Sequence, residues 1–257
     1  MNITDALDST NTPLYDSLSR HTKIHFLPND NWHVNVWYSV FHGKESVIYY
    51  SPVACPQAQL SRQLLFLELQ CNGYRRVLDG LSLLPDTNQW MQTIVKSIDT
   101  CLQNQKIANR WLAMGYDLEQ LLYEDDADIF EYFEQMLAMK GYSEMYLLTS
   151  YWGFTNPLLN VSANQRKYLH QKFCVYAGGK LRTRLLETDS LLFRWANVSA
   201  YEAKTYVLAM ANILGIKQDT WLSYEYNKGA FFEEQFPQAG FFVGQPFGLE
   251  QVRKVYS

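Results

Sequence analysis

The stretch "QLSRQLLFLELQCNGYR", residues 59–75, decides how the amino-terminal half of this chain folds. It contains no proline, and its only glycine is Gly73, close to its end. Apolar side chains recur through it at the spacing of a helix core, at Leu60, Leu64, Leu65, Leu67, Leu69 and Cys71. The pattern predicts a helix over residues 57–72 that ends at Gly73, because glycine readily adopts the left-handed conformation that terminates helices.

A strand-forming segment precedes this helix. Residues 24–50 alternate apolar and polar side chains, and turn-forming residues interrupt the alternation at 28–31 and at 42–44. We therefore expect two or three antiparallel strands, closed by Pro52 and Pro56 before the helix begins. One face of such a sheet is apolar, so the helix should pack against it.

More helices follow toward the carboxy terminus. The apolar spacing predicts one or two helices over residues 88–114 and others over 126–139, 163–176 and 200–214. Gly153 and Pro157 interrupt this pattern and suggest a boundary near residue 150. The expected fold class is α+β and mainly helical, with a small antiparallel sheet packed on the first long helix.

Residues 59–75 resemble the active-site helix of the ImmA/IrrE-like family of zincin metallopeptidases. In that family a small residue precedes His-Glu-Leu-Leu-His, and the helix ends at a glycine followed by an aromatic residue. Here Arg62 stands at the first histidine, Gln63 at the glutamate and Phe66 at the second histidine. The positions that match the family are Ser61, Leu64, Leu65, Gly73 and Tyr74. A chance match by an ordinary amphipathic helix is the alternative.

The resemblance extends over residues 24–126. Residues 101–122 resemble a second helix of some family members, in which histidine sometimes occurs near the positions of Asn104 and Gln105. The resemblance implies a degenerate zincin-like α+β domain over residues 1–150. Residues 151–257 would then form a helical carboxy-terminal region, packed on the first domain.

The residues at the family's metal-binding positions lack the chemistry that zinc requires. Two neutral imidazoles at i and i+4 would project from one helical face toward a single ion. Arg62 supplies a permanent cation instead, and Phe66 has no lone pair. Gln63 cannot accept a proton as a carboxylate does. We therefore expect no bound metal, no other cofactor and no peptidase activity at this helix.

Composition limits the remaining functions. The chain has 257 residues, of which 47% are hydrophobic and 19% charged, so a folded core is expected. The formal net charge of −4 disfavours nucleic acid as a partner. No secretory or membrane-spanning segment stands out, so we expect a cytoplasmic protein that does not bind membranes. Four cysteines without a C-x-x-C pair are expected to be reduced and without a role, at Cys55, Cys71, Cys101 and Cys174.

Three other groups of residues contain side chains that can bind a metal ion or an anion. His21 and His25 have i,i+4 spacing but lie in a strand-like segment, and the remaining histidines are scattered. An acidic run over residues 124–131 suits a helix amino terminus better than a calcium loop. Lys180, Arg182 and Arg184 could contact an anion, although a solvated face of a helix or strand is the simpler interpretation.

The function expected from these observations is binding of another protein. A catalytically inactive metallopeptidase-like chain could act as a regulatory subunit, in bacterial stress response or defence by analogy with the resembled family. The former substrate groove would then bind a partner, lined by Trp32, Trp37, Arg62 and Gln63. An enzyme with an unrecognised non-zinc site and a nucleic-acid-binding accessory protein are the alternatives.

Overall fold

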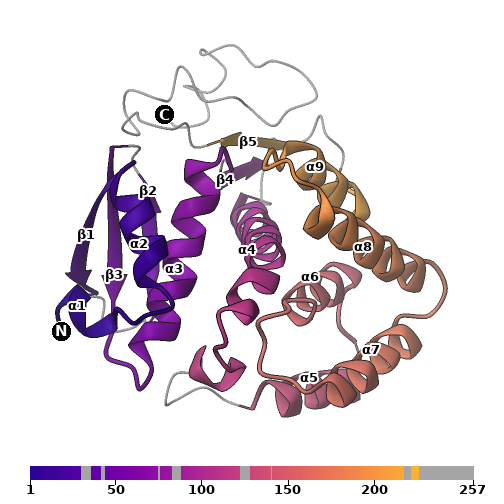
Figure 1. Cartoon of the computed structure of the whole chain (residues 1–257). Coiled ribbons are helices and arrows are strands. Elements are labelled where there is room, and N and C mark those ends of the chain that lie inside the picture. The colour runs from indigo at the N-terminus through magenta and orange to yellow at the C-terminus, as the bar shows by residue number, and fades with distance from the viewer. Residues whose placement is uncertain are drawn as a thin grey trace.

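The computed structural model describes residues 1–29, 36–41, 44–74, 76–82, 88–121, 128–139, 141–216 and 221–225. Over these residues the predicted fold class is confirmed, because helices predominate and accompany a small three-stranded sheet. In Figure 1 the long helix α4 (Asn88–Ala113) runs through the middle of the molecule. The sheet lies on one side of it and most of the later helices lie on the other.

The three-stranded sheet is mixed, so the prediction of a purely antiparallel sheet was wrong. It contains β1 (Lys23–Pro28), β2 (Tyr38–Phe41) and β3 (Glu45–Tyr50) in the order β1-β3-β2. Strands β2 and β3 are antiparallel. Strand β1 lies on the other side of β3 from β2 and pairs with β3 in the parallel direction. Alternation of side chains does not distinguish these pairings.

The helix predicted over residues 57–72 is present as α3 (Pro56–Cys71). Proline is tolerated at its start, where the missing N–H would have no partner in the helix. At its end Gly73 has a φ of 101°, and the N–H of Tyr74 donates to the carbonyl of Leu69. Both α1 (Ile3–Ala6) and α2 (Thr12–Ser19) contact α3. Helix α3 also contacts β2 and α4, and it is therefore buried on several sides.

The carboxy-terminal half of the described chain is a set of packed helices. Helix α4 contacts α6, α8 and α9, and the turn at Gly178 joins α7 to α8. The elements are η1 (Leu118–Leu121), α5 (Ile129–Ala138), α6 (Glu144–Phe154), α7 (Ala163–Ala177), α8 (Gly179–Asn197) and α9 (Lys204–Ile213). Residue 150 lies inside α6, and the division of the chain there stays a prediction.

A second, two-stranded sheet was not predicted. It pairs β4 (Val77–Ser82) with β5 (Trp221–Glu225) in the antiparallel direction. The two strands are far apart in the sequence, and only the tertiary fold brings them together. Among the helices in the described part of the chain, none has the length and apolarity needed to cross a membrane.

Candidate functional site

The metal-binding positions of the resembled family lie where α3 faces α4. Arg62 donates from Nη2 to Oδ1 of Asn104 on α4, at 3.0 Å. Its guanidinium carbon lies 5.5 Å from the ring centroid of Phe66, one turn further along α3. The i,i+4 spacing therefore does place Arg62 and Phe66 on one face, with a side chain of α4 opposite. Asn104, singled out by its place in the second predicted helix, is almost completely buried at 1% exposed.

Gln63 is directed into the interface between α3 and the sheet. It is 3% exposed, and its Nε2 donates to the carbonyl oxygen of Trp37 at 3.1 Å. Trp37 is itself buried, and its Nε1 donates to the carbonyl oxygen of Ser51 at 2.8 Å. The structure thus brings Gln63 and Trp37 together in the protein interior, not on the wall of an open groove. The other predicted groove residue, Trp32, lies outside the described residues.

These side chains do not fit a zinc ion. The Arg62 guanidinium and the Gln63 amide nitrogen both donate hydrogen bonds here, and Phe66 has no donor atom for a metal. Within the described part of the chain, no group of three or more His, Cys, Asp or Glu side chains is arranged to hold a metal ion. No metal-assisted step can therefore be derived at this face of α3.

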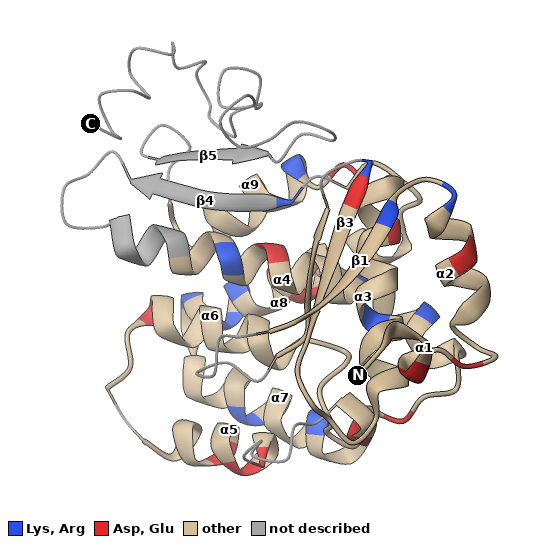
Figure 2. Ribbon diagram, turned by 90° about the vertical axis from the view of Figure 1, so that its left-hand side faces the viewer, with Lys and Arg blue, Asp and Glu red and all other residues tan. Residues whose placement is uncertain are grey.

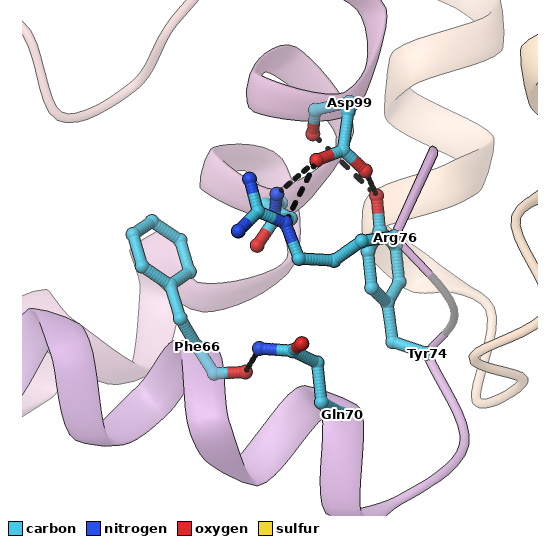
Figure 3. A network of polar contacts seen from close by, with 6 residues as sticks. Phe66, Gln70, Tyr74, Arg76 and Asp99 are labelled. Atoms are coloured by element: carbon cyan, nitrogen blue, oxygen red, sulfur yellow. Dashed lines mark hydrogen bonds and ion pairs between the residues drawn. The ribbon is translucent and has the colours of Figure 1, made fainter. Parts of the chain in front are cut away.

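A buried polar network ties the end of α3 to α4 (Figure 3). Asp99 of α4 is its centre, with a side chain only 2% exposed. Its carboxylate accepts from the Tyr74 hydroxyl at 2.8 Å, from Arg76 Nε at 3.2 Å and from Gln103 Nε2 at 2.6 Å. Burial, and then the charge of Asp99, raise the pKa of the Tyr74 hydroxyl well above its usual value. These contacts join the residues after the end of α3 to the middle of α4.

A cleft of about 830 Å³ opens between α4, α6, α7 and α8, away from the α3 positions. Tyr151 of α6 donates its hydroxyl to Asp189 of α8, 2.7 Å from Oδ1 and 2.9 Å from Oδ2. His170 of α7 approaches the same carboxylate, with Nε2 3.0 Å from Oδ2. Burial, and then the charge of Asp189, raise the pKa of Tyr151 well above its usual value. A carboxylate, an imidazole and a phenol therefore meet at one edge of the cleft.

This cluster was not predicted, because His170 is isolated from the other histidines in the sequence. His170 and Cys174 do have i,i+4 spacing on a predicted helix, which was the available signal. Asp189 and Tyr151 come from two other helices, so no local pattern could connect them to His170.

The predicted anion contacts lie at the start of α8. Arg184 forms an ion pair with Glu144 of α6, with Nη1 2.9 Å from Oε2, while Lys180 and Arg182 are exposed. In Figure 2 basic and acidic residues lie interspersed over the described elements. The pairing of Arg184 reduces the positive charge that this turn offers to an anion.

His25 and Asp128, from the predicted histidine pair and the predicted acidic run, both contact neighbouring residues of the fold. His25 lies in β1, with Nε2 3.8 Å from Glu45 Oε2. Asp128 caps α5, accepting from the N–H groups of Phe130 and Glu131. Residues 122–127, which hold the rest of the predicted acidic run up to Asp128, lie outside the described residues.

Comparisons of the chain with protein-family models, with curated proteins and with solved structures gave no match.

Proposed function

We propose that this protein is a metal-free relative of the ImmA/IrrE-like zincins that acts as a protein-binding, regulatory subunit. The observation that carries the proposal is the contact of Arg62 with Asn104, with Phe66 beside it. A cation and a benzyl ring occupy the helix face that would have to bind zinc, and a buried amide of α4 holds the cation in place. The order of hairpin, helix, Gly-Tyr end and second helix supports the family origin.

The partner would bind by strand addition at β2. Within the described residues β2 is hydrogen-bonded to β3 and is one of the two edge strands of its sheet, the other being β1. The bond from Gln63 to the carbonyl of Trp37 fixes the backbone immediately before β2. An edge strand offers backbone N–H and C=O groups to an extended peptide, and neighbouring side chains give specificity.

A pair of stacked tyrosines on β2 and β3, one exposed and one half-buried, would contact such a peptide. Tyr38 of β2 is 40% exposed, and its ring stacks on that of Tyr49 with 4.6 Å between the centroids. Tyrosine is enriched at protein interfaces because a rigid ring buries a large area at low entropic cost. A role in bacterial stress response or defence rests on analogy with the resembled family alone.

Hydrogen exchange of the full chain with its purified partner tests the binding mode. We expect the amides of residues 38–41 that do not face β3 to exchange at least about 10-fold more slowly in the complex, since strand addition gives them hydrogen-bond partners. Tyr38→Ala should raise the Kd for the partner about 10-fold, which corresponds to a loss of ~1.4 kcal/mol of binding free energy.

Tyr132→Ala on α5 is the matched control, because Tyr132 is 48% exposed and lies on a different element. The Kd of the Tyr132→Ala variant for the partner should equal that of the unmodified chain. Unchanged exchange in β2, with protection confined to the α7 and α8 helices, would contradict strand addition.

A further inference from the structure

Cys174 lies beside the Tyr151–Asp189–His170 cluster. It follows His170 by one turn of α7, and its Sγ is 3.9 Å from Nδ1 of the imidazole. The thiol is free and half-buried. A thiol, an imidazole and a carboxylate are therefore aligned in that order, as in enzymes that use a cysteine nucleophile.

The hydrogen bonds around Asp189 determine which nitrogen of His170 carries the proton. An ionised carboxylate only accepts hydrogen bonds, so the His170 nitrogen that faces it, Nε2, must be the N–H donor. The neutral ring then has its lone pair on Nδ1, the nitrogen that faces the thiol. The hydroxyl of Tyr151 donates to both carboxylate oxygens and holds Asp189 in this orientation.

We propose that Cys174 is a nucleophile that attacks esters or thioesters with an apolar acyl group, with His170 as its general base. Asp189 and Tyr151 are positioning residues, since they act through His170. His170 and Asp189 line the cleft, and Cys174 lies beside it, one turn of α7 beyond His170. Phe154, Leu192 and Phe193 give the cleft an apolar wall for the acyl group. Phe193 is 71% exposed, a large solvent-facing ring that a bound acyl chain would cover.

The reaction balances with water as its only co-reactant. The Cys174 thiol gives its proton to Nδ1 of His170 while sulfur bonds to the carbonyl carbon of the substrate. The bond from that carbon to the leaving oxygen or sulfur breaks, and the leaving group takes the proton from His170. Water then hydrolyses the acyl-cysteine by the same route, which releases a carboxylic acid and restores the thiol.

The surroundings of the thiol explain why the base is needed. Burial raises the pKa of Cys174, the charge of Asp189 raises it further, and Arg182 opposes both. The thiol therefore rests in its neutral form and loses its proton only when His170 accepts it.

Acylation by p-nitrophenyl butyrate tests the proposal. We expect a burst of p-nitrophenolate and a butyryl group on the Cys174 peptide in mass spectra of the digested full chain. Cys174→Ala should abolish both signals, and His170→Gln should lower the acylation rate about 100-fold. Asp189→Asn should lower kcat about 10-fold or more with little change in KM, because it disturbs the tautomer and leaves the cleft unaltered.

Cys55→Ser is the control, because Cys55 lies at the start of α3 and makes no side-chain cap bond there. Its acylation should match that of the unmodified chain, and circular dichroism should show that every variant is folded. Equal iodoacetamide labelling rates at Cys174 in the unmodified chain and in folded His170→Gln would overturn the proposal. Butyryl groups spread equally over Cys55, Cys71 and Cys174 would also overturn it.

Discussion

Replacing Trp195 with alanine should lower the free energy of unfolding by about 4 kcal/mol, in the range for large buried aromatic residues. Trp195 of α8 is 0% exposed, and its Nε1 donates to the carbonyl of Leu102 on α4 at 2.7 Å. Lys106 Nζ lies 4.2 Å from its ring centroid, and the ring of Tyr206 lies 4.8 Å away. The substitution would leave a cavity where α8 and α9 meet α4.

Urea denaturation of the full chain, followed by circular dichroism, measures this loss. Phe193→Ala on the same helix is the control, because Phe193 is 71% exposed and should change stability by less than about 0.5 kcal/mol. A loss below about 1 kcal/mol for Trp195→Ala would mean that α8 does not share a core with α4.

Asp99→Ala should be the next most destabilising change, at about 3 kcal/mol. The Tyr74 hydroxyl and the Gln103 amide both donate to this buried carboxylate and would lose their acceptor. Arg76 contributes less, because its side chain is 33% exposed and water screens its charge. Tyr74→Phe removes one of these bonds and should cost about 1.5 kcal/mol.

Glu68→Ala provides the comparison on the surface of the same two helices. Glu68, whose side chain is 21% exposed, pairs with Arg110 of α4, whose side chain is 55% exposed and in contact with water. Surface ion pairs contribute about 0–1 kcal/mol, so the chemical denaturation curve should shift little. Equal losses for Asp99→Ala and Glu68→Ala would contradict a structural role for the buried network.

Local signals in the sequence predicted α3, α4, α5, α7 and α9, whereas α6 and α8 were not predicted. Helix α3 follows from the spacing of its apolar residues, and its end follows from the preference of Gly73 for a positive φ. Both signals depend only on residues that are close in the sequence. The strand pairing depends on the path of the chain beyond those neighbours. The parallel β1–β3 pair was therefore missed, and so was the β4–β5 sheet.

The candidate site was predicted in part. The i,i+4 spacing predicted that Arg62 and Phe66 share one face of α3. Asn104 was singled out on the second predicted helix, which does lie opposite that face. The burial of Gln63 could not be predicted in the same way. The elements that pack around a helix determine which of its faces is buried. The cluster at His170 needs three helices, and its members acquire their chemistry only when the fold brings them together.

The zinc content of the full chain tests the central claim most directly. The chain should be purified without chelators, equilibrated with zinc and dialysed, and the metal measured by mass spectrometry. The contact of Arg62 with Asn104 predicts zinc well below one ion per chain, with no change in Asn104→Ala. About one zinc per chain, lost in Asn104→Ala while the protein stays folded, would contradict the claim.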